Sequence, residues 1–296
     1  MVIPCALSWK RRGGRIMVSR LIAQVEEDEA LAEDKVLLVD ARDDVEWVTL
    51  NRPDQRNALN LALVDALAHY FEGLREREDV RVVVLRANGK HFCAGLDMSP
   101  GAFPALGEAP VHAWRTQRSI ARIYLAMRKC PQPIICLVQG AACGGGFSLA
   151  LASDIRIAGE TAKMNAAYIK IGLTGCDMGS SYFLPRLVGT SVASELLMTG
   201  RFIHARRAQA VNLVSDVVPD TELENAAQGW VDDLLLTSPM GLRLTKDGLN
   251  MAIDAPSLEA AMAVEDRHQS LLSLSEDMKE AGLAFFEKRP PVYQDR

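Results

Sequence analysis

Short, almost wholly apolar runs separated by polar turns dominate the chain from residue 35 onward. The runs "KVLLVD" and "VEWVTL" predict two strands joined by the polar turn 42–44, and "RVVVLRA", "PIICLVQG" and "DIRIAG" predict further buried strands. Residues 61–75 carry apolar side chains at helical spacing, and a short helix is predicted over 145–152. This alternation of buried strands and helices indicates an α/β fold.

The pattern changes near Ser181, where strands almost disappear and amphipathic helices begin. We predict helices over 191–200, 225–236, 240–253 and 258–272. The acidic stretch "EEDEALAED" near the N-terminus is typical of a solvated, flexible segment. We therefore expect a flexible N-terminal extension (1–34), a core (35–235) and a C-terminal helical region (236–296) that makes oligomer contacts.

Composition and charge narrow the classes of partner. The chain has 296 residues, is 49% hydrophobic and carries a formal net charge of -5, so it can bury a full core and has no basic face for nucleic acid. No apolar run approaches the roughly 20 residues of a membrane helix. The six cysteines form no CxxC pair and no zinc-like spacing with histidine. We expect reduced thiols, a cytoplasmic location, no metal site and no membrane partner.

Three consecutive glycines, Gly144 to Gly146, end one predicted strand and open a helix. A helix N-terminus presents free backbone N–H groups and the positive end of the helix dipole, so this turn can hold an anion. The stretch "GKHFCAGLD" is a second strand exit with a glycine that lets an amide turn inward. Two such amides could share one oxygen atom; the alternatives are a tight turn and an ordinary loop.

The chain closely resembles the crotonase (enoyl-CoA hydratase/isomerase) family. The resemblance runs from about residue 36 to 288 and is carried by "NRPDQRNALN", "HFCAGLD", "QPIICLVQGAACGGGFSLALASDIRIA", "LPRLVGTSVASELLMTGR" and "EDMKEAGLAFFEKR". It implies a crotonase-like ββα spiral core, a C-terminal helical region that builds a homotrimer or a dimer of trimers, and acyl-CoA thioester substrates. Coenzyme A would be part of the substrate, and no separate cofactor is implied.

The resemblance also implies an oxyanion hole, in which two backbone N–H groups hold the thioester oxygen. These groups correspond here to Leu96 and Gly145, with Ala94 and Gly144 beside them among the substrate-binding residues. Removing a proton next to a thioester carbonyl requires stabilisation of the enolate oxygen as it forms. Preorganised amides supply this stabilisation, at about 2.7 to 4 kcal/mol per donor.

For the CoA moiety, the resemblance points to the turn "QRNAL" and to the C-terminus. Arg56 and the backbone of Ala58 would meet the phosphates and the adenine. Phe285 and Lys288 match C-terminal positions that reach the nucleotide, often from a neighbouring subunit. An ordinary surface charge is the alternative role for Arg56 and for Lys288.

The chain departs from the family pattern at the two catalytic glutamates of the hydratases, where it has Ser148 and Tyr168. Neither hydroxyl can act as a carboxylate base, since even a tyrosine ordinarily titrates near ~10. Asp177, just before a helix start at Gly179, is the replacement acid, with helix N-capping as its alternative role. Asp97 is a weaker catalytic candidate that we expect to fix the loop presenting Leu96.

These residues are compatible with four interpretations. In the favoured one the chain is an enoyl-CoA isomerase that moves a 3-ene to the 2-position, with Leu96 and Gly145 holding the enolate and Asp177 carrying the proton. The others are a hydratase whose Tyr168 and Ser148 orient water, a hydrolase or dehalogenase with Asp177 as nucleophile, and a catalytically silent CoA-binding homologue. The Pro- and Gly-containing stretch 98–114 predicts a mobile lid on the acyl channel.

Overall fold

The computed structural model describes residues 35–103 and 109–296. The chain divides into two units, Met1–Val36 and Leu37–Arg296. The expected N-terminal extension, 1–34, lies outside the described residues. All of the strands and helices in the described ranges belong to the second unit.

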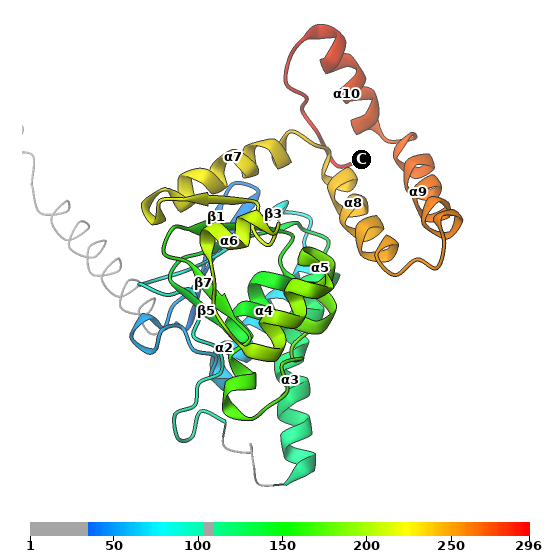
Figure 1. The fold of residues 1–296 in the computed structure, drawn as a ribbon. Coiled ribbons are helices and arrows are strands. Elements are labelled where there is room, and N and C mark those ends of the chain that lie inside the picture. The colour runs from blue at the N-terminus through cyan, green and yellow to red at the C-terminus, as the bar shows by residue number, and fades with distance from the viewer. Residues whose placement is uncertain (1–34, 104–108) are drawn as a thin grey trace, which may run out of the picture. The chain divides into compact units, whose positions relative to one another are not determined.

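The main sheet has six strands in the order β1-β2-β3-β4-β6-β9 (Figure 1). Their bounds are β1 Leu37–Arg42, β2 Val45–Leu50, β3 Val82–Ala87, β4 Ile134–Val138, β6 Ile155–Gly159 and β9 Asp216–Val218. β1 pairs with β2 antiparallel, and every later pairing in this sheet is parallel. β2 and β4 are buried along their whole length, as expected of strands covered on both faces.

One face of the main sheet packs on α7 (Leu223–Leu235). Trp47 of β2, Val84 of β3 and Ile135 of β4 share a register row and belong to one buried cluster with residues of α7. Figure 1 draws α7 across this sheet. The α/β prediction is therefore confirmed for the core.

A second, three-stranded sheet has the order β5-β7-β8 (β5 Ala141–Cys143, β7 Lys163–Asn165, β8 Ile203–His204). β5 follows β4 almost directly and leads into α4 (Gly145–Ala152), all of whose residues are buried. Because each of its strands is only two or three residues long, this sheet has no hydrophobic period in the sequence. It nevertheless carries the glycine turn.

The remaining elements are helices. They are α2 (Leu61–Gly73), α3 (Pro110–Lys129), α5 (Ser180–Thr199), α6 (Ala205–Ala210), α8 (Pro239–Ala252), α9 (Leu258–Leu272) and α10 (Glu276–Glu287), with 3-10 turns η1 (Pro53–Gln55), η2 (Leu74–Glu76), η3 (Ala167–Ile171) and η4 (Asp220–Glu222). The helical C-terminal region is confirmed; its role in oligomer formation stays a prediction. None of the helices in the described ranges is long and apolar enough to cross a membrane.

The C-terminal end of the predicted lid, 98–114, is helical, because α3 begins at Pro110; its mobility stays a prediction. Residues 104–108 lie outside the described ranges. The buried side chains of α3 fall in its second half, from Ile120 to Met127, while its first half is largely polar. The first half therefore lacks the apolar face by which a helix is recognised in a sequence.

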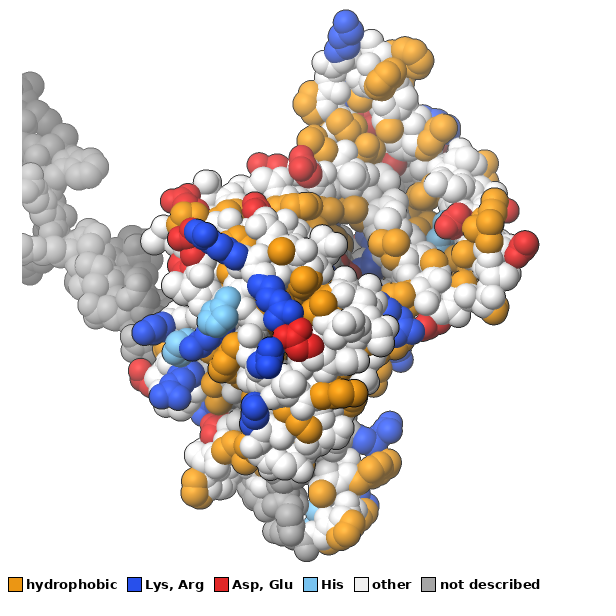
Figure 2. Space-filling view, viewed as in Figure 1, with side chains coloured by type: hydrophobic (Ala, Val, Ile, Leu, Met, Phe, Trp, Pro, Cys, Tyr) orange, Lys and Arg blue, Asp and Glu red, His pale blue; other side chains and the backbone are white. Residues whose placement is uncertain are grey.

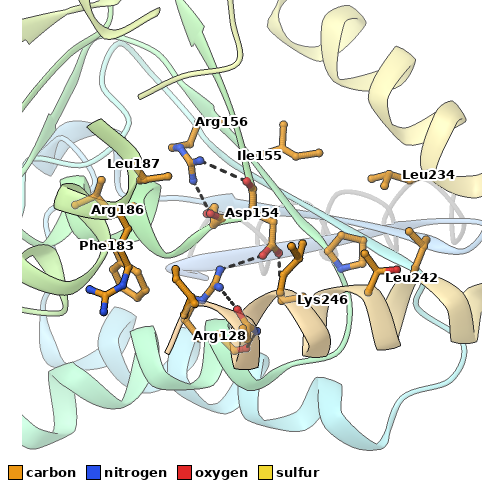
Figure 3. A pocket seen from close by; sticks show the side chains of 17 residues that line it. Arg128, Asp154, Ile155, Arg156, Phe183, Arg186, Leu187, Leu234, Leu242 and Lys246 are labelled. Carbon is orange, nitrogen blue, oxygen red and sulfur yellow. Dashed lines mark hydrogen bonds and ion pairs between the residues drawn. The ribbon is translucent and has the colours of Figure 1, made fainter. Parts of the chain in front are cut away.

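A partly buried ion pair attaches α8 to the core (Figure 3). Asp154 accepts hydrogen bonds from the Ile134 backbone (2.8 Å) and from Arg128 (3.1 Å), and its carboxylate lies 2.8 Å from Lys246 Nζ. Lys246, which is 6% exposed, also donates to the Gln132 carbonyl at 2.7 Å. These groups line a cavity of about 360 Å³, but because they bind one another we assign them a structural role.

Candidate active site

The turn from β5 into α4 depends on Gly144. Its backbone has φ 49° and ψ -116°, a conformation that glycine adopts readily and other residues rarely do. Its N–H donates to the Asn165 carbonyl of β7 at 2.9 Å, which fixes the turn to the second sheet. Gly145 is then the first residue of α4, and its N–H donates to no acceptor within the described ranges.

The Leu96 amide is free for a different reason. Leu59 donates to the Gly95 carbonyl (2.8 Å) and accepts from the Asp97 N–H (2.9 Å), so Leu59 uses both of its backbone groups in this parallel bridge. In such a bridge the N–H of the opposite residue, Leu96, points away, and it has no acceptor in the part of the chain that the structure describes. The N–H groups of Leu96 and Gly145 are thus both free in the described ranges, while their role in holding a thioester oxygen stays a prediction.

Gly95 lets the loop that presents Leu96 approach the glycine turn closely. A Cβ atom built on Gly95 would lie 2.7 Å from the Cys143 carbonyl oxygen and 3.6 Å from the Gly145 nitrogen. Cys93 donates to the Ala141 carbonyl (3.0 Å) and accepts from Cys143 (2.9 Å), so the loop and the turn are bonded to each other directly. The geometry suits an oxygen atom bound between two N–H groups.

Asp97 is occupied in holding this loop. Its carboxylate accepts from the Ser99 N–H (3.0 Å) and hydroxyl (2.5 Å) and pairs with Arg52 (3.0 Å). The Ser99 hydrogen bond, assisted by Arg52, lowers the pKa of Asp97. A carboxylate bound in this way is a poor proton acceptor, which agrees with the expected loop-fixing role.

Asn57 is a structural residue that the sequence reasoning missed. Its buried side chain accepts from the Arg52 N–H (2.8 Å) and donates to the carbonyls of Asn88 (2.8 Å) and His91 (2.9 Å). It thereby joins the "NRPDQRNALN" turn to the loop that presents Leu96. Its positive φ of 54° leaves no signal in the sequence beyond an asparagine in a turn.

Ser148 and Tyr168 lie side by side next to the glycine turn. They are 0% and 5% exposed, and apart from their contacts with each other and with the Ser180 hydroxyl, neither hydroxyl has a hydrogen-bond partner among the described residues. Burial raises the pKa of Tyr168, an effect that the nearby hydroxyls of Ser180 and Ser148 only partly offset. Both groups are therefore neutral at physiological pH, as the sequence predicted.

Asp177 lies near Tyr168, and its alternative role, capping the N-terminus of α5, is wrong. The N-cap of α5 is Gly179, and no side chain caps this helix. The Asp177 carboxylate instead accepts from the Met178 N–H (2.7 Å) and from the side-chain amide of Gln117 in α3. Burial raises the pKa of the half-buried Asp177, and its negative charge in turn raises the pKa of Tyr168.

Helix α3 supplies two residues that the sequence reasoning missed, Gln117 and Tyr124. The buried Tyr124 hydroxyl donates to the Gly145 carbonyl at 3.1 Å and lies 3.1 Å from Met178 Sδ. It therefore supports the first turn of α4 from behind. Neither residue belongs to a motif. Only a prediction of helix α3 from the sequence could have pointed to them.

The residues expected to bind CoA are not all brought together in one chain. Arg56 is exposed in the η1 turn, and its carbonyl accepts from the Ala94 N–H at 3.0 Å. The Ala58 N–H donates to Gln55, and its carbonyl accepts from Arg52, which leaves one carbonyl lone pair free. Figure 1 draws α10, which carries Phe285 and ends before Lys288, apart from α2 and α4.

Comparisons with known proteins agree on the family. The family model described as enoyl-CoA hydratase/isomerase matches residues 40–296. A "probable enoyl-CoA hydratase" of Mycobacterium tuberculosis is 37% identical over 94% of this chain and 99% of its own length. The 1,2-epoxyphenylacetyl-CoA isomerase of Escherichia coli is 32% identical over 83% of this chain and 93% of its own.

Solved structures give the same result. The crystal structure of an enoyl-CoA hydratase from Bacillus anthracis matches with a TM-score of 0.82 and 32% identity, over 88% of this chain and all of the other. The fold, the two free amides and the matches in sequence and structure all indicate the same family. The chain belongs to the crotonase superfamily as a member of the enoyl-CoA hydratase/isomerase family, whose substrates are acyl-CoA thioesters.

Proposed function

We propose that this protein is an enoyl-CoA isomerase that moves a double bond from the 3- to the 2-position of an acyl-CoA thioester. The observation that carries the proposal is the half-buried carboxylate of Asp177 near the amide pair, with neutral hydroxyls at Ser148 and Tyr168. One base that takes a proton and returns it to a second carbon needs no second carboxylate. Its pKa, raised by burial, makes it a better proton acceptor than a solvated aspartate.

The chemistry requires two steps. The Asp177 carboxylate takes a proton from C2, and the electron pair of that C–H bond delocalises onto the thioester oxygen between the amides of Leu96 and Gly145. Protonated Asp177 then delivers the proton to C4, where the C3–C4 π electrons form the new C–H bond. The C1–C2 π electrons of the dienolate become the C2–C3 double bond, and the oxygen lone pair restores the thioester carbonyl. The amides stabilise the enolate, by about 2.7 to 4 kcal/mol each.

A hydratase is the second candidate, and the hydroxyl pair favours it. The neighbouring buried hydroxyls of Ser148 and Tyr168 could bind and orient a water molecule. The names of the relatives divide between the two activities, since the M. tuberculosis protein is named a hydratase and the E. coli protein an isomerase. Neither hydroxyl can serve as a base, so hydration would also depend on Asp177.

Asp177→Asn tests the assignment. Asparagine keeps the size and the hydrogen-bond acceptor but removes the base, so conversion of 3-enoyl-CoA should fall by roughly 10² to 10⁴. Asp232→Asn, an exposed change on α7, is the matched control and should retain the parental rate. Assays of isomerisation, hydration and hydrolysis in parallel identify the reaction lost. Parental rates in the Asp177 variant would refute the role, and a parent without any turnover would favour a silent homologue.

A further inference from the structure

The two carboxylate oxygens of Asp177 have different surroundings. Oδ1 accepts from the Met178 N–H at 2.7 Å and also from the side-chain amide of Gln117. Oδ2 accepts from no donor in the parts of the chain that the structure describes. An ionised carboxylate has about four lone-pair sites on its two oxygens. The two hydrogen bonds therefore hold Oδ1 and leave the lone pairs of Oδ2 available to a proton.

Helix α3 holds Gln117 in place, although the side chain itself is exposed. Ile120, three residues further along the helix, is buried at 1% exposure. Tyr124 lies seven residues from Gln117, on the same helix face, and donates to the Gly145 carbonyl at 3.1 Å. One face of α3 therefore contacts both the Asp177 carboxylate and the turn that presents the Gly145 amide.

No charged side chain in the described ranges shifts the pKa of Asp177. Burial raises this pKa, and the Met178 N–H and the Gln117 amide lower it. The titratable groups next to the carboxylate are the thiol of Cys176 and the phenols of Tyr124 and Tyr168. Burial raises the pKa of both phenols, so both are neutral at physiological pH. A donor to the ionised carboxylate favours that form, so the Gln117 amide helps to keep the base deprotonated.

We propose that Gln117 is a positioning residue, which holds Oδ1 of Asp177 and so leaves Oδ2 to carry the proton between C2 and C4 of the acyl chain. A base that serves two carbons must keep one oxygen within reach of both, and a carboxylate free to turn about its Cβ–Cγ bond does so only part of the time. The proposal rests on the proposed function for the role of Asp177 as the base.

Gln117→Met tests this role, because methionine keeps the side-chain length and the helix preference but has no N–H donor. For 3-enoyl-CoA isomerisation, kcat should fall about tenfold, as expected when a charged group loses one hydrogen bond. KM should stay within about twofold of the parental value, because the lost contact is to the base. The acid limb of the pH–kcat profile should move to higher pH, since the ionised form of Asp177 has lost a donor.

Two further variants sharpen the test. Gln117→Glu places a second carboxylate against Asp177, so it should lower kcat more than Gln117→Met and move the acid limb further in the same direction. Gln228→Met is the matched control. Gln228 is an exposed glutamine of α7 that donates to the Asp232 carboxylate at 2.7 Å, away from the site. Its loss should leave kcat, KM and the pH profile at their parental values.

Parental kcat and a parental pH profile in Gln117→Met would overturn the positioning role. If they occur while Asp177→Asn loses activity, this role fails alone and the proposed function stands. If Asp177→Asn keeps the parental rate, the base lies elsewhere and both proposals fail. If the parent has no turnover, the proposed function fails, and an NMR titration of the Asp177 carboxyl carbon still tests the contact: its pKa should be higher in Gln117→Met than in the parent. Should Gln117→Met not fold, Gln117→Glu decides.

Discussion

At the scale of single residues, the candidate site shifts the pKa values of two titratable groups from their ordinary values. Burial raises the pKa of Asp177 above its ordinary value of 3.8, and burial also raises that of Tyr168. A raised carboxyl pKa in the folded state means that ionised Asp177 destabilises the protein at neutral pH. This cost disappears as the pH falls through the raised pKa towards 3.8, where the group is protonated.

The stability of Asp177→Asn should show this cost. At pH 7 the variant should be at least as stable as the parent, because the buried charge is gone. The difference should shrink as the pH falls, since protonation relieves the parent. Urea denaturation of both proteins between pH 7 and pH 4 measures it. A variant clearly less stable than the parent at pH 7 would contradict the burial of an ionised carboxylate.

At the scale of elements, the two later glycines of the turn let α4 pack against its neighbours. A Cβ on Gly146 would lie 2.4 Å from the Cys93 carbonyl oxygen, which belongs to the loop that presents Leu96. A Cβ on Gly145 would lie 2.7 Å from Leu59 Cδ1, the end of a side chain. A backbone atom moves less readily than a side-chain methyl group. A larger residue should therefore be tolerated less well at Gly146 than at Gly145.

Alanine substitutions should rank accordingly. Gly146→Ala should lower the free energy of unfolding by about 1 to 3 kcal/mol, the usual cost of overpacking, and Gly145→Ala by less. Gly229→Ala in α7, where nothing lies within 4 Å of the new Cβ, should instead stabilise by about 0.5 to 1 kcal/mol. Chemical denaturation ranks the three proteins. The reverse order at Gly145 and Gly146 would show that α4 does not contact the loop in this way.

The sequence predicts elements that have a clear hydrophobic period and misses those that do not. Runs rich in apolar residues made β2, β3 and β4 recognisable, and the glycines after β4 predicted the amide at Gly145. The strands β5, β7 and β8 are too short to show a period. Because the first half of α3 is largely polar, that helix was not predicted. Its residues Gln117, which binds Asp177, and Tyr124, which binds the Gly145 carbonyl, were therefore missed.

At the scale of the whole molecule, the C-terminal helices expose large apolar side chains. Leu274, Phe285 and Phe286 are 79%, 78% and 82% exposed, and Figure 2 shows hydrophobic groups on the surface of this region. Exposed apolar patches of this kind mark contacts with another protein. They support the proposal, taken from the family resemblance, that copies of this chain assemble through the C-terminal region.

Removal of residues 278–296 should therefore lower both the oligomeric state and the affinity for CoA. The double variant Phe285→Ser, Phe286→Ser is a milder change that keeps α10 and should act in the same direction on assembly. Light scattering at micromolar concentration gives the mass of each protein, and calorimetry gives the affinity. A full-length chain that is monomeric and binds CoA normally would count against the assembly.

The central claim is that the free amides of Leu96 and Gly145 hold the thioester oxygen. A crystal structure of the protein with butyryl-CoA bound tests this claim most directly, because butyryl-CoA has the thioester but no double bond to react. The account predicts the thioester oxygen at about 2.7 to 3.2 Å from both nitrogens, with the acyl chain passing Asp177. A thioester bound elsewhere, or an oxygen in contact with neither amide, would contradict it.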